Sequence, residues 1–178
     1  MNRQLVGYGI LLALMLVAPA VVYPVLVMKI LCFALFACAF NLLIGYTGLL
    51  SFGHAVFLGT AGYVAGHSIK VWGFPPEIGL IFAALAAAAL GWVIGSLAIR
   101  RSGIYFAMIT LALAQMMYFF AIQAHFTGGE DGIQAVPRGR LFGIIDLAGQ
   151  MNMYVTVLVI FLAGFLLIHR IIHSPFGE

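Results

Sequence analysis

Two histidines are the first side chains in this sequence that suggest chemistry inside an apolar stretch. His54 and His67 are 13 residues apart, which would place them about 140° from each other on one helix. No second stretch carries a matching pair, so the sequence gives no support for a haem held between two histidines. All five acidic residues lie in predicted loops or at the C-terminus. A carboxylate relay that moves protons across a membrane is therefore not expected.

The sequence also lacks the motifs of nucleotide binding and hydrolysis. Neither Lys29 nor Lys70 follows a glycine, so no P-loop is present that could cradle ATP. HExxH and GxSxG do not occur, and Cys32 and Cys38 both lie in apolar sequence. This placement argues against a disulfide framework or a zinc site. We therefore expect a protein that is not an enzyme and that has no metal or cofactor of its own.

Composition places the protein in a membrane. Of its 178 residues, 65% are hydrophobic and only 7% are charged, whereas about 25% of the residues of a soluble domain are charged. The net charge of +3 is too dilute for a nucleic-acid surface. The sequence predicts an all-α, polytopic bundle of transmembrane helices that forms a single domain over residues 1–178.

Apolar stretches of about 20 residues mark the helices that could cross the bilayer. The 45 residues from 25 to 69 are long enough for two spans and a tight turn. We expect about six crossings, or five if residues 51–69 re-enter the membrane. Residues 5–23 resemble a signal peptide, but the sequence that follows stays apolar, so we expect an uncleaved span. The other predicted spans are residues 78–99, 104–123 and 153–169.

Positive charges divide equally between the two predicted sides of the membrane. The compact turn at Arg100 and Arg101 carries the clearer signal, so we expect this turn on the cytoplasmic side. Residues 124–152 would then form an extracytoplasmic loop.

A run of small residues follows one face of the helix predicted after residue 51. On a helical wheel they fall within a strip about 60° wide, which favours close packing against another helix. A strip that lines a wet pathway is the alternative interpretation. The small residues of this strip are Ala55, Gly59, Gly62 and Gly66, and Gly91 and Gly95 form a second small pair that could be its partner.

The segment Gly45-Tyr46-Thr47-Gly48 suggests a break between helices, with Ser51 as the N-cap of the next helix. Such a break could present a helix N-terminus to a polar cavity, or it could be a plain interfacial turn. Polar groups within spans could likewise line a pathway or bond between helices. The candidate pathway residues are Asn41, Tyr46, Thr47, Ser51, His54 and Gln115.

Four segments together resemble a known family. Residues 41–66, RRSGIYFAMITLALAQMMYFF (100–120), FTGGEDGIQAVPRG (126–139) and HSPFG (173–177) occur in matching order over residues 40–177. In these segments the sequence is similar to the permease subunit of branched-chain amino-acid ABC importers.

The resemblance implies an inner-membrane subunit that is driven by ATP hydrolysis on other subunits. The implied partners are a second related permease, two cytoplasmic ATPases, a periplasmic amino-acid-binding protein and the lipid bilayer, with no nucleic acid. In the family the loop after residue 123 faces the binding protein. The residues expected to face it are Thr127, Gly128, Gly129, Pro137 and Arg138.

The sequence departs from the family at its end. Family members continue past SPFG into a charged segment that couples to the ATPase and then into further spans, whereas this sequence ends at Glu178. We therefore expect the N-terminal part of a longer permease, as a fragment or a truncated gene product, that does not transport alone. A permease for urea or short-chain amides and a membrane scaffold without a pathway remain as alternatives.

Overall fold

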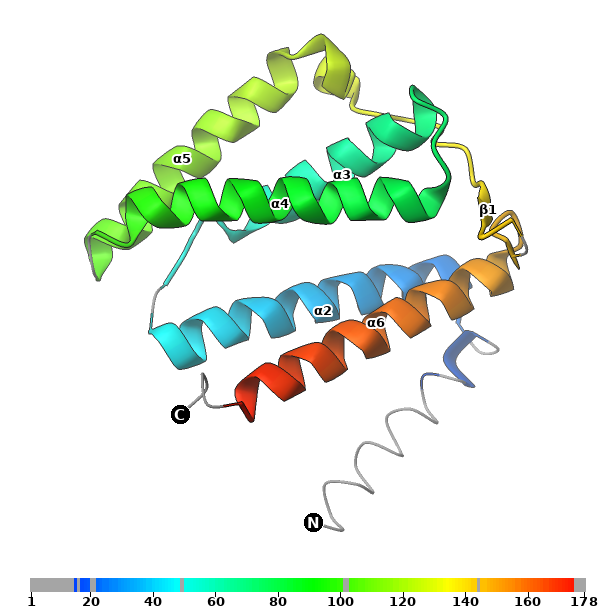
Figure 1. Ribbon diagram of the computed structural model, residues 1–178, viewed down its shortest axis with the longest axis horizontal. Coiled ribbons are helices and arrows are strands. Elements are labelled where there is room, and N and C mark those ends of the chain that lie inside the picture. Colours follow the sequence, from blue (N-terminus) through cyan, green and yellow to red (C-terminus); the bar gives the residue numbers. More distant parts are fainter. Residues whose placement is uncertain are drawn as a thin grey trace. The chain divides into compact units, whose positions relative to one another are not determined.

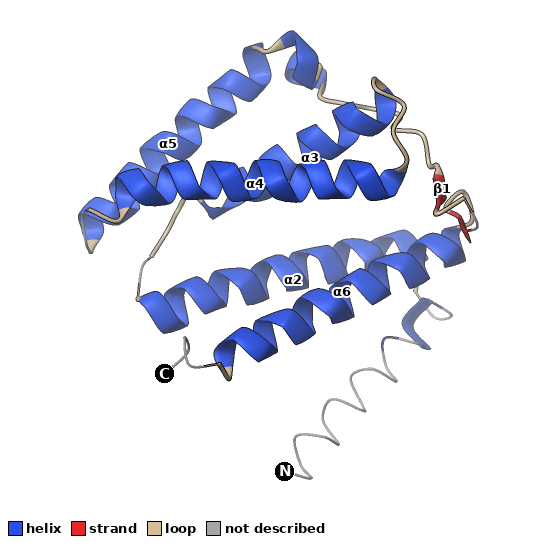
Figure 2. Cartoon of the chain, in the orientation of Figure 1, coloured by secondary structure: helices blue, strands red, loops and turns tan. Residues whose placement is uncertain are grey.

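The computed structural model describes residues 15, 17–19, 22–48, 50–100, 103–143 and 145–174. The described chain is mostly helical (Figure 2). Its long helices are α2 (Pro24–Thr47), α3 (His54–Lys70), α4 (Pro76–Ala98), α5 (Ile104–Gln123) and α6 (Gln150–Ile172). Most of the predicted first span, residues 5–23, lies outside the described residues, as do Arg101 and residues 175–178.

Among the described helices, four are long and apolar enough to cross a membrane: Pro24–Gly45, Pro76–Ala98, Ile104–Gln123 and Gln150–Ile172. These helices confirm the predicted all-α, multi-pass membrane fold. Residues 51–69, which were predicted to cross or re-enter the membrane, form most of α3, a helix of 17 residues. At 1.5 Å per residue α3 is about 26 Å long, slightly shorter than the hydrocarbon core of a bilayer.

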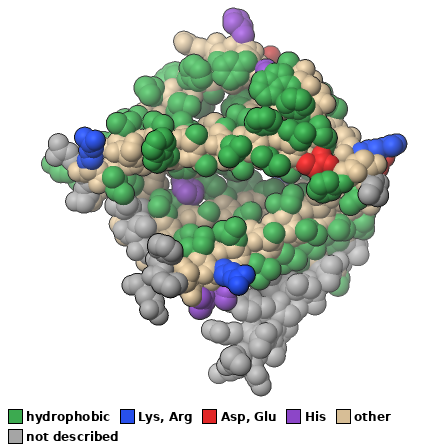
Figure 3. Space-filling view, in the orientation of Figure 1, with side chains coloured by type: hydrophobic (Ala, Val, Ile, Leu, Met, Phe, Trp, Pro, Cys, Tyr) green, Lys and Arg blue, Asp and Glu red, His purple; other side chains and the backbone are tan. Residues whose placement is uncertain are grey.

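Side-chain exposure agrees with a lipid environment. Trp92 on α4 is 79% exposed and Leu85 is 61% exposed. Hydrophobic side chains cover the visible face of α4, and charged side chains lie near its two ends (Figure 3). In water such a surface would be costly, whereas in a bilayer it matches the solvent.

The described chain separates into two compact units, Met1–Cys38 with Leu147–Glu178, and Ala39–Asp146. In the first unit, the start of α2 lies beside α6 (Figure 1). Their contact buries a cluster in which Leu31 is 2% and Tyr154 is 1% exposed. A Cβ placed on Gly164 would lie 2.9 Å from Cδ1 of Leu35. The absence of a side chain at Gly164 therefore allows the two helices to approach closely.

The second unit contains α3, α4, α5 and the loop that follows. Pro75 and Pro76 start α4 at its N-cap and first helical position, where proline costs no hydrogen bond. Gly79 gives the close approach of α4 to α3, because a Cβ there would lie 2.8 Å from Cγ1 of Ile69. At the other end of α3, a Cβ on Gly53 would lie 2.7 Å from the carbonyl oxygen of Thr110 on α5.

The loop between α5 and α6 is ordered by contacts with helix ends. It contains two short 3₁₀ helices, η1 (His125–Thr127) and η2 (Gly129–Asp131), and a small antiparallel hairpin of β1 (Arg140–Leu141) and β2 (Ile145–Asp146). The Lys70 ammonium donates to the carbonyl oxygen of Gln134 at 2.8 Å, and the backbone N–H of Phe142 donates to Glu77. The hairpin is absent from our sequence-based prediction. Helix α6 begins at Gln150, slightly before the predicted loop of residues 124–152 ends.

Candidate functional site

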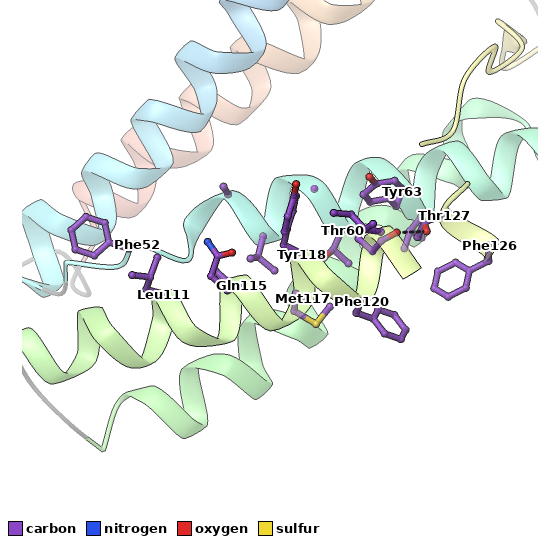
Figure 4. A pocket seen from close by; sticks show the side chains of 17 residues that line it. Phe52, Thr60, Tyr63, Leu111, Gln115, Met117, Tyr118, Phe120, Phe126 and Thr127 are labelled. Carbon is purple, nitrogen blue, oxygen red and sulfur yellow. Dashed lines mark hydrogen bonds between the residues drawn. The ribbon is translucent and has the colours of Figure 1, made fainter. Parts of the chain in front are cut away.

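A groove of about 510 Å³ lies in the second unit along α3 and α5. Figure 4 shows its labelled residues in a row, with Phe52 and Leu111 near one end and Phe126 and Thr127 at the other. The volume is within the usual range for small-molecule sites. The residues that line it from α3 are Ala55, Val56, Gly59, Thr60, Tyr63 and Val64, and α5 supplies Leu111, Ala114, Gln115, Met117, Tyr118, Phe120, Ala121 and Ile122.

The groove lies between a contact of α3 with α5 at one end and η1 at the other. At one end, the missing side chain of Gly53 lets α3 meet the backbone of α5 at Thr110. At the other end, η1 contributes Phe126 and Thr127 to the lining. Between these contacts α3 carries Gly59, and a Cβ there would meet no heavy atom of the described residues within 4 Å.

The lining is largely apolar and contains a few neutral polar groups. These are the hydroxyls of Thr60, Tyr63, Tyr118 and Thr127 and the amide of Gln115. None of the described lining residues is charged. Gln115 is exposed, and the described residues make no hydrogen bond to its side chain. Its amide can therefore donate to or accept from a bound molecule.

Of the predicted pathway residues, Gln115 lines the groove, whereas Asn41 and His54 do not. Asn41 is exposed on α2. His54 is half-buried, with its ring 5.4 Å from that of Phe40 and 5.7 Å from that of Phe57. Tyr46 and Thr47 belong to the last turn of α2, and their side chains lie outside the described part of the structure.

The prediction for Ser51 is wrong in its detail. The N-cap of α3 is Gly53, and His54 is the first helical residue. Ser51 is 5% exposed, and its hydroxyl oxygen accepts the backbone N–H of Gly53 at 3.3 Å. The hydroxyl thus fixes the turn that precedes α3, because it bonds two residues ahead before the helix has begun.

The predicted break at residues 45–48 is correct only at its second glycine. Helix α2 continues through Gly45 and ends at Thr47. Gly48 has φ of +63°, a left-handed conformation that stops a helix and that suits glycine. Gly45 is therefore tolerated as a helical residue.

Two glycines of the predicted packing strip on α3 do not pack closely against any described residue. A Cβ on Gly59 or Gly62 would meet nothing within 4 Å among the described residues, and the same holds for Gly95 on α4. Ala55 and Gly59 line the groove instead. A Cβ on Gly66 would lie 3.4 Å from Ile133 of the loop, and one on Gly91 would lie 3.7 Å from Phe57, both ordinary contact distances.

Sequence comparison shows the family. Residues 24–178 match the family described as the permease component of the branched-chain amino acid transport system. The chain belongs to this permease family. It is 30% identical over 105 residues to the high-affinity branched-chain amino acid transport system permease protein LivM of Escherichia coli, and equally to that of Salmonella typhimurium. Each match covers 58% of this chain and 25% of the relative, so the matched part is a quarter of the curated relatives' length. No solved structure matches the chain.

The loop residues expected to face a binding protein have different surroundings. Gly128, Pro137 and Arg138 are exposed and Gly129 is half-buried. Thr127 is only 3% exposed, and its hydroxyl donates to the carbonyl oxygens of Ala121 and Ala124. The prediction that Thr127 faces a partner is therefore wrong, because this side chain is used inside the loop.

Sequence reasoning missed most of the residues that line the groove. Leu111, Gln115 and Tyr118 lie at the i, i+4 and i+7 positions of one face of α5, and Gly59 and Tyr63 lie at i and i+4 on α3. This spacing was the available signal, but it does not reveal which face of each helix meets the other. Among the described residues, no group of three or more His, Cys, Asp and Glu residues could hold a metal ion. The absence of a cofactor stays a prediction.

Proposed function

We propose that this chain is part of the transmembrane permease subunit of an ABC importer for branched-chain amino acids, and that the groove between α3 and α5 is part of the pathway. Membership of the permease family over residues 24–178 is the observation that carries the proposal. The groove adds a physical reason, since it offers an apolar surface with neutral polar groups along α5, one of the helices long and apolar enough to cross a membrane.

A branched-chain amino acid has an apolar side chain and a charged backbone end. The apolar lining suits the first part, and the Gln115 amide and the tyrosine hydroxyls can hydrogen-bond the ammonium and carboxylate groups. Neutral groups bind these charges less strongly than ionic partners would. Weak binding favours transport, because a pathway must release what it admits.

Energy and delivery would come from other subunits. The sequence contains no P-loop, so we propose that two cytoplasmic ATPases bind and hydrolyse ATP while a second, related permease completes the pathway. We further propose that the protein lies in the cell inner membrane, with the turn at Arg100 and Arg101 in the cytoplasm. The exposed Gly128, Pro137 and Arg138 of the loop would then meet a periplasmic binding protein.

The two alternatives predict different outcomes for transport. A permease for urea or short-chain amides would handle small polar molecules, for which a largely apolar groove gives no advantage. A scaffold without a pathway would not need the Gln115 amide beside an open groove. The branched-chain proposal therefore agrees best with the lining.

The test is uptake by the complete importer in proteoliposomes, with its ATPases and binding protein. We expect ATP-dependent uptake of leucine, isoleucine and valine but not of urea. Replacing Gln115 by Leu should lower the uptake rate about tenfold, because it removes hydrogen bonds to a charged ligand. Gln123→Leu is the matched control on the same helix, outside the groove lining, and should leave uptake unchanged. Equal uptake by the parent and both variants would contradict the role of Gln115, and uptake of urea alone would support the amide permease.

A further inference from the structure

We propose that η1 is a movable stopper at one end of the groove and that His67 holds it in the closed position. This inference rests on the proposed function in one respect: it gives the stopper a purpose by treating the groove as a pathway. The contacts that hold η1 at the end of the groove lie within the second unit.

The 3₁₀ helix η1 forms one end of the groove. Phe126 and Thr127 both line the groove, at the end opposite Phe52 (Figure 4). Thr127 is buried and hydrogen-bonds the last turn of α5 through the carbonyl oxygens of Ala121 and Ala124, the second at 2.6 Å. On the α5 side, η1 is therefore anchored directly to the helix that precedes it.

His67 supplies the connection to the opposite wall. Its Nδ1 lies 3.0 Å from the carbonyl oxygen of Phe126, so the Nδ1–H tautomer donates a hydrogen bond to η1. The His67 ring also meets the Phe126 ring edge to face, with centroids 6.2 Å apart. The Trp72 ring packs edge to face against the same imidazole, with ring centroids 5.5 Å apart, and helps to orient it. Within the described chain, this is the side-chain hydrogen bond that joins η1 to α3.

The backbone on each side of η1 allows it to move as a short unit. Ala124 has an extended conformation (φ −75°, ψ 127°), so the helical hydrogen bonding of α5 does not continue into η1. Gly128, on the other side, has φ of +83°, and a Cβ there would lie 2.4 Å from the carbonyl oxygen of Gly132. The glycine is therefore required for the tight turn that follows. Rotation at Ala124 and Gly128 would displace η1 without unfolding α5 or α3, but it would break the hydrogen bonds of Thr127 to Ala121 and Ala124.

Opening this end of the groove breaks the Thr127 bonds to α5 and, in addition, the bond between His67 and Phe126. A hydrogen bond of this kind contributes a modest net stabilisation, so removing it should increase the open population about threefold to tenfold. The bond is thus strong enough to bias the stopper towards closure and weak enough to be broken in each transport cycle. His67 is accordingly a positioning residue that acts through Phe126.

The test measures access to the groove rather than transport. In the complete importer, with Cys32 and Cys38 replaced by Ala, a single cysteine at Ala114 reports from inside the groove. A small, permanently charged methanethiosulfonate reagent is added on the side of the loop, and the rate of modification is measured. His67→Phe keeps an aromatic ring but removes the donor, so we expect the rate to rise about threefold to tenfold.

Two further variants separate the hydrogen bond from packing. His67→Asn places an amide N–H near the position of Nδ1 and should restore the parent rate. His125→Phe is the matched control in the same 3₁₀ helix. Within the described structure the His125 side chain makes no hydrogen bond or ring contact. In this variant the cysteine at position 114 should therefore be modified at the parent rate.

Three outcomes would overturn the inference. The first is an equal rate in the parent and His67→Phe, and the second is an equal rise in His67→Phe and His67→Asn, which would mean that packing matters rather than the bond. The third is a cysteine at position 114 that stays unreactive in every variant. Leucine uptake by the parent is measured in parallel. Uptake with no effect of His67→Phe on the modification rate rejects the stopper alone, whereas the expected rates without uptake reject the proposed function alone.

Discussion

Gly164 on α6 and Gly59 on α3 are both helical glycines in a strongly apolar chain, yet their surroundings are opposite. Gly164 lies in the packed pair of α2 and α6, where a Cβ would approach Leu35 to 2.9 Å. Gly59 lies on the open face of α3 beside α5, where a Cβ would meet nothing described within 4 Å. Small residues thus bring helices together in one pair and leave space in the other. The surroundings, and not the residue type, decide which use a glycine has.

Gly53 allows a close approach between α3 and α5, and its substitution should lower the stability more than that of Gly164. In Gly53→Ala the new Cβ would lie 2.7 Å from a backbone carbonyl oxygen of Thr110, which cannot rotate away. We expect a loss of about 2 kcal/mol in the free energy of unfolding, seen as a lower midpoint of thermal denaturation in detergent. An unchanged midpoint would show that the two helices are free to separate at this end of the groove.

Gly164→Ala should have a smaller effect, because the neighbouring group is the end of a flexible side chain. Leu35 can adopt another rotamer, and alanine gains helix propensity, so we expect a loss of less than about 1 kcal/mol. The double variant Gly164→Ala with Leu35→Val should recover the parent midpoint by removing the crowded methyl group. A loss as large as that of Gly53→Ala, without recovery in the double variant, would mean that the pair of α2 and α6 is too rigid for this explanation.

Apolar length allowed the main helices to be predicted from the sequence. The predicted spans 78–99 and 104–123 agree closely with α4 and α5, because uninterrupted apolar runs of this length have few alternatives in a membrane. The prediction of 153–169 was shorter than α6, whose first turn contains the polar Gln150 and Asn152. A criterion based on apolar length does not detect polar residues in the first or last turn of a helix.

The groove could not be predicted, because it depends on which faces of distant helices meet. The helical wheel correctly placed Ala55, Gly59, Gly62 and Gly66 on one side of α3, but it carries no information about what lies opposite. Gly66 meets Ile133, which is far along the chain, and Gly59 meets open space. Gln115 was recognised from its polarity alone, whereas the contact of His67 with Phe126 required the loop to fold back onto α3.

The central claim is that the groove between α3 and α5 carries substrate, and Gly59→Leu tests it most directly. Gly59 lines the groove with open space before it, so a leucine should fill the groove without disturbing the fold. Gly62 and Gly95 also have open space but do not line the groove, so Gly62→Leu and Gly95→Leu are matched controls. We predict that all three variants keep the thermal midpoint of the parent in the complete importer, while leucine uptake is lost only in Gly59→Leu. Uptake by Gly59→Leu at the rate of the two controls would contradict the claim.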